Sequence, residues 1–206
     1  DLTYEAFSLS EKYRMPVLVL ADGLIGQMME GVVLPEPIDL ATLPRKPYAV
    51  GHAQEMGRDY NHVSSINLVP DELEAKNRER FQRYEVIKKE LCRYEEIEVE
   101  DADIVFVAYG TSARVSHGAL MMARERGLKV GLFRPITLWP FPYDRIAELA
   151  AQGKRFLSVE MSMGQMVEDV RLAVNGKSEV YFYGRCGGNI PSQEEVFAEV
   201  ARLLGK

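Results

Sequence analysis

Apolar runs alternate with segments of helical period over the second half of the chain. Residues 103–109 form an almost continuous apolar run before a glycine, which is typical of a strand buried on both faces. After it, apolar side chains recur at i, i+4, i+7 and i+8, a spacing that predicts an amphipathic helix. The alternation continues with strands expected at residues 129–133, 155–160 and 180–183, each followed by a helical segment.

Strands and helices that alternate in this way are joined by right-handed crossovers, so they form a mostly parallel sheet with helices on both faces. The sequence therefore predicts an α/β fold with a three-layer α/β/α domain. Two helix starts carry the Ser-x-x-Glu/Gln pattern of a capping box, Ser162 with Gln165 and Ser192 with Glu195.

The first hundred residues follow a different pattern. Residues 3–14 have helical spacing, and residues 16–21 (PVLVLA) form an apolar run that predicts a buried strand followed by a turn at Asp22. Prolines at positions 35, 37, 44 and 47 exclude a continuous helix or a central strand, which is typical of a connector. Apolar side chains then line one side of a long charged helix expected at residues 71–96. We expect the chain to begin inside a larger protein, because it starts with Asp1 in a segment of helical spacing.

Composition and charge narrow the class of protein. Hydrophobic residues make up 47 % and charged residues 27 %, which is close to the globular average and predicts a folded domain. A formal charge of −6 argues against nucleic acid as a partner. The apolar run at 16–21 is far shorter than the roughly 18 residues of a membrane span, so no membrane anchor is expected. The low cysteine count and the lack of a basic leader indicate the cytoplasm as the expected compartment. Two cysteines are also too few to hold an iron-sulfur cluster by this chain alone.

Ligands of open parallel sheets bind beside the loops beyond the carboxyl ends of the strands, and these loops share one face. The loop Gly110-Thr111-Ser112 enters a helix, and its backbone amides could hold a phosphate or a carboxylate. It lacks the glycines of a dinucleotide fingerprint and the lysine of a P-loop. Helix capping alone is therefore the simpler interpretation.

Two further loops at this edge carry candidate residues. Glu160 ends a buried strand and could act as an acid, but no second carboxylate or histidine adjoins it, so an interface or capping role is favoured. Arg185, Gly187 and Asn189 follow the last strand, where the glycines allow close approach of another backbone and Arg185 offers a fork for an anion. A plain tight turn fits the same residues. If this loop contacts a partner, Arg185→Glu should leave the stability of this chain nearly unchanged.

The remaining candidates form no catalytic set. Cys186 has no neighbouring histidine to activate its thiol. His52, His62 and His117 are too scattered for a zinc site, and the sequence contains no HExxH or CxxC motif. We therefore predict no catalytic, cofactor-binding or metal-binding residue in this chain.

Three runs resemble the C-terminal part of the alpha subunit of the 2-oxoacid:ferredoxin oxidoreductases. They are residues 107–114 (VAYGTSAR), 132–142 (LFRPITLWPFP) and 159–165 (VEMSMGQ), and the proline-rich run is quite specific. Residues 21–30 (ADGLIGQMME) are more similar to the 2-oxoisovalerate (branched-chain) type than to the 2-oxoglutarate type. The resemblance covers essentially the whole chain.

The resemblance implies a domain organisation and an activity. Residues 1–45 would be the tail of a pyrimidine-binding domain, 46–100 a connector with the long charged helix, and 101–206 a transketolase C-terminal-like domain. The family converts a 2-oxo acid and coenzyme A to acyl-coenzyme A and carbon dioxide, and passes the electrons to ferredoxin. This chain would supply scaffold and subunit contacts.

The same resemblance implies which cofactors and partners the chain works with. Thiamine diphosphate and magnesium would be held by the beta subunit, whose Gly-Asp-Gly motif with paired asparagines is absent here. Iron-sulfur clusters would lie in other subunits, with gamma and ferredoxin-like delta subunits completing the complex.

Two other classes fit the residues without the resemblance. A stand-alone α/β module could bind a nucleotide or coenzyme A through the glycine-rich loops. A structural or assembly domain would instead present a large apolar patch to other chains.

Overall fold

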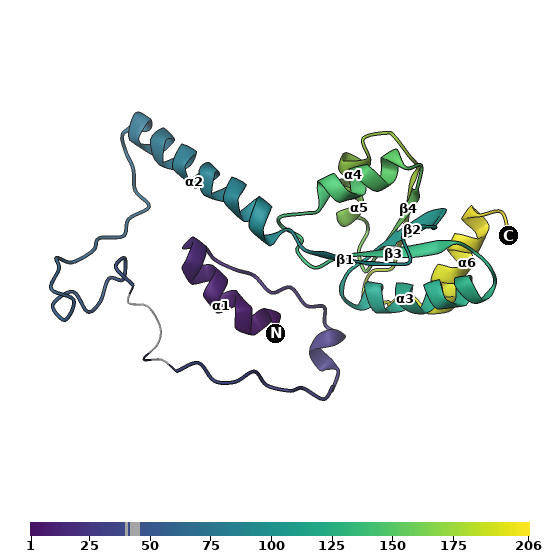
Figure 1. The fold of residues 1–206 in the computed structure, drawn as a ribbon, viewed down its shortest axis with the longest axis horizontal. Coiled ribbons are helices and arrows are strands. Elements are labelled where there is room, and N and C mark those ends of the chain that lie inside the picture. The colour runs from purple at the N-terminus through teal and green to yellow at the C-terminus, as the bar shows by residue number, and fades with distance from the viewer. Residues whose placement is uncertain (40, 42–45) are drawn as a thin grey trace. The chain divides into compact units, whose positions relative to one another are not determined.

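A computed structural model describes residues 1–39, 41 and 46–206. The chain divides into two units, of which the first holds Asp1–Val19 and Glu30–Val86 and the second holds Leu20–Met29 and Ile87–Lys206 (Figure 1). Within the described residues, no helix combines the length and the apolar character needed to cross a membrane. The candidate site belongs to the second unit.

The second unit is built on a five-stranded sheet in the order β1-β3-β2-β4-β5. The last four strands run parallel to one another, and β1 pairs antiparallel with β3. The predicted mostly parallel α/β sheet is therefore confirmed, with an additional antiparallel edge strand. The strands are β1 (Tyr94–Ile97), β2 (Ile104–Val107), β3 (Val130–Pro135), β4 (Arg155–Glu160) and β5 (Val180–Gly184).

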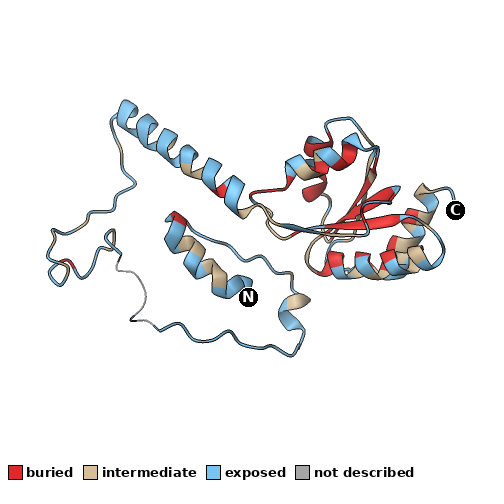
Figure 2. Cartoon of the chain, in the orientation of Figure 1, coloured by how far each residue is buried: buried red, intermediate tan, exposed pale blue. Residues whose placement is uncertain are grey.

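Helices cover both faces of this sheet, which confirms the expected three layers (Figures 1 and 2). Ile104 and Phe106 on β2 pack with the helices of one face, while Val105 and Val107 pack with those of the other. All four side chains are fully buried, which explains why the run is apolar at every position. On the first face lie α3 (Gly110–Glu125) and α6 (Gln193–Leu203), and on the second lie α4 (Tyr143–Ala151) and α5 (Met166–Val174).

The long helix expected at residues 71–96 proves to be two elements. The helix α2 spans Pro70–Leu91, and the residues after it form strand β1. Tyr94 pairs with Pro135 across the sheet, and its ring stacks on Phe133 with centroids 4.9 Å apart. The prediction failed because Tyr94 continues the helical spacing of α2 by chance, whereas pairing with a strand some forty residues later decides its conformation.

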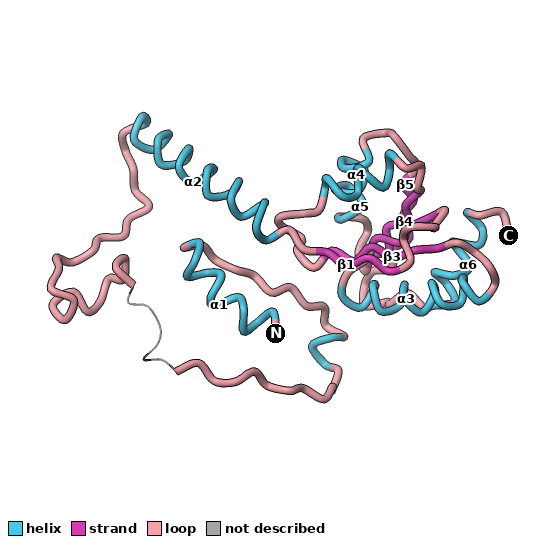
Figure 3. The backbone as a smooth tube through the Cα atoms, in the orientation of Figure 1, coloured by secondary structure: helices cyan, strands magenta, loops and turns pink. Residues whose placement is uncertain are grey.

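Residues 16–21 do not form the predicted buried strand (Figure 3). The side chains of Leu18 and Leu20 are 76 % and 67 % exposed, and no described residue pairs with this run. A strand needs a neighbour to satisfy its backbone hydrogen bonds, so an apolar run alone does not produce one. The helix expected just before it is confirmed as α1 (Leu2–Tyr13), and the turn after it as a short 3₁₀ helix at Ile25–Gln27.

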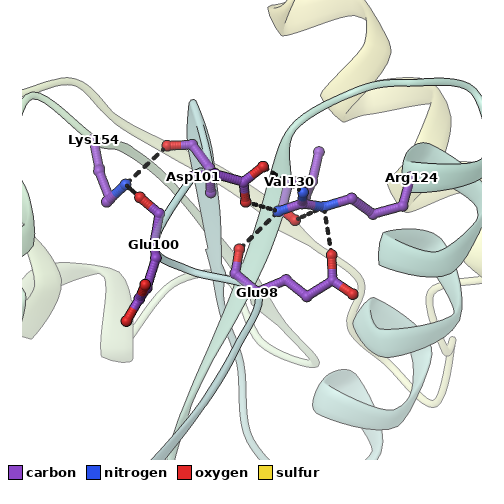
Figure 4. Close-up of polar contacts among 7 residues, drawn as sticks. Glu98, Glu100, Asp101, Arg124, Val130 and Lys154 are labelled. Atoms are coloured by element: carbon purple, nitrogen blue, oxygen red, sulfur yellow. Dashed lines mark hydrogen bonds and ion pairs between the residues drawn. The ribbon is translucent and has the colours of Figure 1, made fainter.

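A polar cluster fastens the segment between β1 and β2 to the rest of the second unit (Figure 4). The guanidinium of Arg124 donates a bidentate pair of hydrogen bonds to Asp101, at 2.9 and 2.8 Å, and also bonds the backbone oxygens of Glu98 and Val130. Lys154 is buried, and its Nζ donates to the backbone oxygen of Glu100 at 2.7 Å. These contacts lie at the amino ends of the parallel strands, opposite the candidate site.

We expect Arg124→Lys to lower the free energy of unfolding by about 1–2 kcal/mol, because an ammonium group cannot reproduce the planar fork that holds these partners. Urea denaturation measures the change. Arg171→Lys on the exposed face of α5 is the matched control and should change stability by less than about 0.5 kcal/mol. Equal effects of both substitutions would show that the cluster does not stabilise the sheet.

Candidate functional site

The candidate site is the edge of the sheet where β2, β4 and β5 end. Parallel pairing sets Val107 opposite Ser158, and Glu160 opposite Gly184. The loops after these strands therefore emerge together, as expected. Strand β2 lies between β3 and β4, so the chain order reverses there, and such switch points are where open α/β sheets form crevices.

A carboxylate from a distant part of the chain occupies the N-terminus of α3. The Thr111 backbone N–H donates to Asp22 Oδ2 at 3.1 Å, and the Thr111 hydroxyl donates to Asp22 Oδ1 at 3.0 Å. The Ile25 backbone N–H donates to the same Oδ1 at 2.9 Å. The loop Gly110-Thr111-Ser112 thus binds a carboxylate of the chain itself, a role for Asp22 that the sequence analysis missed.

The backbone at Gly110 allows this approach. Its φ is 57°, in the left-handed region, and a Cβ there would lie 3.1 Å from Asp22 Oδ2. Thr111 and Ser112 are both buried, so the helix N-terminus has little contact with solvent. Burial raises the pKa of Asp22, but the hydrogen bonds from Ile25 and Thr111 outweigh it and hold the pKa below its usual value. Asp22 therefore remains ionised at neutral pH.

Glu160 performs the same task for α5. Its buried carboxylate accepts hydrogen bonds from the backbone N–H groups of Gln165, Met166 and Val167, at 2.8–3.1 Å. The hydroxyls of Ser158 and Ser162 also donate to it, at 3.0 and 2.9 Å. With five donors around it, Glu160 is a structural cap, which is one of the two roles, interface or capping, that the sequence favours.

This arrangement corrects one of the two predicted capping boxes. Ser162 does not cap a helix with Gln165, because its hydroxyl bonds Glu160 and accepts from the Gly164 N–H at 3.0 Å. Because the charged Glu160 carboxylate already accepts from three N–H groups at the start of α5, the serine is not needed as a cap. The other box is confirmed, since Ser192 and Glu195 bond each other's backbone N–H groups.

Tyr109, which was not singled out from the sequence, lies near enough to both carboxylates for their charges to act on its phenol. It is the residue before α3, and its ring packs against the core formed by α4 and α5. Burial and the negative charges of Glu160 and Asp22 raise the pKa of its phenol. Tyr109 therefore keeps its proton at neutral pH and can act there only as a neutral hydrogen-bonding group.

Arg185 is engaged within the chain. Its guanidinium forms an ion pair with the Glu195 carboxylate, and its backbone N–H donates to the Glu160 carbonyl at 3.1 Å. The expectation that Arg185→Glu leaves stability unchanged therefore needs correction, because the substitution would place two carboxylates together at the start of α6. The following turn has Gly187 at φ 67° and is closed by Asn189, whose amide donates to the Cys186 carbonyl at 3.2 Å.

Apolar and sulfur-containing side chains contribute to the exposed part of this edge. Met163 is 81 % exposed, and its Sδ lies 3.5 Å from the Sγ of Cys186, which is also exposed. Ile190 adds a third exposed apolar side chain. Among the described residues, no three His, Cys, Asp or Glu side chains lie together in a way that could hold a metal ion. Met163 and Ile190 therefore give this edge exposed apolar surface that could contact another chain.

Several known proteins are similar in sequence to this chain. The profile of pyruvate:ferredoxin oxidoreductase core domain II matches residues 102–196. Ketoisovalerate oxidoreductase subunit VorB of Methanothermobacter thermautotrophicus is 47 % identical over 205 residues, which is 100 % of this chain and 57 % of the relative. 2-Oxoglutarate synthase subunit KorA of Methanocaldococcus jannaschii is 32 % identical over 95 % of this chain and 58 % of the relative.

A solved structure is similar in fold. The 2-oxoglutarate:ferredoxin oxidoreductase from Magnetococcus marinus, with 2-oxoglutarate, coenzyme A and succinyl-CoA bound, superposes with a TM-score of 0.71 at 20 % identity. The match covers 98 % of this chain and 39 % of that chain. This chain spans little more than half the length of these VorB and KorA relatives, 57 % and 58 % respectively.

We expect Glu160→Gln to lower the free energy of unfolding by about 2–3 kcal/mol, because the amide removes a charge and one acceptor from buried N–H donors. Thermal unfolding followed by circular dichroism measures the loss. Glu168→Gln is the matched control, since Glu168 lies exposed in the first turn of α5 and should cost less than about 1 kcal/mol. A Glu160→Gln variant as stable as the control would contradict the capping role.

Proposed function

Because the chain belongs to the 2-oxoacid:ferredoxin oxidoreductase family, we propose that it forms the C-terminal part of the alpha subunit of such an enzyme. The enzyme would convert a 2-oxo acid and coenzyme A to acyl-coenzyme A and carbon dioxide, with ferredoxin as electron acceptor. The observation that carries this proposal is 47 % identity with a ketoisovalerate oxidoreductase subunit across the whole chain.

The 2-oxo acid is proposed to be branched, as 2-oxoisovalerate is. Two ketoisovalerate oxidoreductase subunits are 47 % and 45 % identical to this chain. Identity is 32 % with a 2-oxoglutarate synthase subunit and 26 % with a pyruvate synthase subunit. The higher identity with the ketoisovalerate subunits agrees with the similarity of residues 21–30 to the branched-chain type.

The domains are assigned on the same basis. Residues 1–45 would be the tail of a pyrimidine-binding domain, 46–100 the connector, and 101–206 the transketolase C-terminal-like domain. The exposed apolar run at residues 16–21 supports this assignment, because such a run is stable when neighbouring strands of the same domain cover it. Residues 40 and 42–45, which fall near the first boundary, lie outside the described residues.

Within the enzyme, this chain would act as scaffold. Thiamine diphosphate binds through a diphosphate, and the helix N-termini of α3 and α5 that could receive one are already filled by Asp22 and Glu160. The described residues of this edge therefore do not fit the cofactor. We assign thiamine diphosphate with magnesium to a beta subunit, and the iron-sulfur clusters to other subunits, including gamma and ferredoxin-like delta chains.

We expect the purified complex that contains this sequence to reduce a viologen dye with 2-oxoisovalerate and coenzyme A. Rates with pyruvate and 2-oxoglutarate should be at least several-fold lower, and this chain alone should show no reduction. A preference for 2-oxoglutarate would contradict the branched-chain assignment. If coenzyme A or a nucleotide instead raised the melting temperature of this chain alone, a stand-alone binding module would be the better interpretation.

The exposed edge at Met163 is proposed to contact the beta subunit. A buried charge at such a contact is costly, so Met163→Glu should weaken co-purification of the beta subunit at least several-fold. The melting temperature of this chain alone should stay unchanged, because the side chain is exposed. Met121→Glu on the exposed side of α3 is the matched control. Equal co-purification of both variants would place the contact elsewhere.

A further inference from the structure

A short segment leaves one unit of the chain to join the other. Residues 20–29, which we call the strap, belong to the second unit, whereas the residues before and after them belong to the first. The strap is closed internally by hydrogen bonds from the N–H groups of Gly26 to Asp22 and of Gln27 to Leu24, at 3.1 and 3.0 Å. It is therefore a compact turn within a longer connection.

Most of the strap makes little contact with the domain. Leu20, Met28 and Met29 are 67 %, 43 % and 98 % exposed. The contacts that hold it gather at Asp22, which bonds Thr111, and at Ile25, whose Cδ1 lies 3.7 Å from the position that a Cβ would take at Gly110. The Asp22 carboxylate thus provides a polar attachment between the strap and α3.

We propose that Asp22 is a clasp that holds the strap on the carboxyl edge of the sheet, and that breaking its bonds to Thr111 releases the strap while the domain stays folded. The carboxylate faces the N-terminus of a 16-residue helix, where a negative charge and oriented N–H groups attract each other. The same carboxylate also accepts from Ile25 and so orders the turn that it attaches. Docking and local order of the strap are coupled through one side chain.

Asp22 and Thr111 both belong to the second unit, so the clasp is a contact within that unit. The clasp holds the strap against the N-terminus of α3, directly after Tyr109. This inference rests on contacts within the chain and is independent of the proposed enzymatic function.

Hydrogen exchange measured by mass spectrometry on the full chain tests the clasp. Asp22→Asn should speed exchange in residues 24–28 and at the Thr111 amide by roughly tenfold or more, because a charge-assisted attachment is lost. Exchange in β2, β3 and β4 should stay unchanged. Asp59→Asn, an exposed acid of the first unit, is the matched control and should alter neither region.

A double-mutant cycle separates a clasp from a general loss of structure. Thr111→Val removes the hydroxyl at nearly constant volume and should also speed strap exchange, whereas Thr111→Ser keeps the hydroxyl and should restore slow exchange. Combined with Asp22→Asn, Thr111→Val should add little, because both changes break one contact. Additive effects, unchanged strap exchange in Asp22→Asn, or equally faster exchange in the sheet strands would overturn the proposal.

Discussion

Parallel strands that return in the same direction bring the N-termini of α3 and α5 to one edge of the sheet, where each helix needs acceptors for its free N–H groups. Asp22 supplies the acceptor for α3, and Glu160 supplies it for α5. Both carboxylates belong to the chain itself. The character of the candidate site follows from this requirement, because the groups that could have bound an anion or moved a proton are engaged in capping.

This edge of the sheet presents exposed apolar side chains and the neutral phenol of Tyr109. Burial and the charges of Glu160 and Asp22 keep Tyr109 protonated, Arg185 is paired with Glu195, and Met163 remains exposed. These properties suit a domain that positions other parts of an enzyme, and they support the proposed scaffold role. The opposite edge is held by Arg124 and Lys154, so polar contacts fasten the domain at both ends of its strands.

Three local predictions were wrong because groups outside each local pattern, or the lack of a pairing partner, decide the structure. Ser162 has the spacing of a helix cap, yet Glu160 offers a charged acceptor at the same place. Tyr94 extends the apolar spacing of α2, yet β3 offers it a strand to pair with. Residues 16–21 have the composition of a buried strand, and among the described residues nothing pairs with them.

The order of elements, the parallel sheet, its two apolar faces and the shared edge of the loops followed from the sequence by itself, since they depend on periodicity and on the handedness of crossovers. The Ser192–Glu195 box followed too, because its partners are three residues apart. Only the tertiary structure decided what fills the edge. The bond between Asp22 and Thr111 joins residues 89 positions apart, and no local pattern encodes which carboxylate will reach a helix N-terminus once the chain has folded.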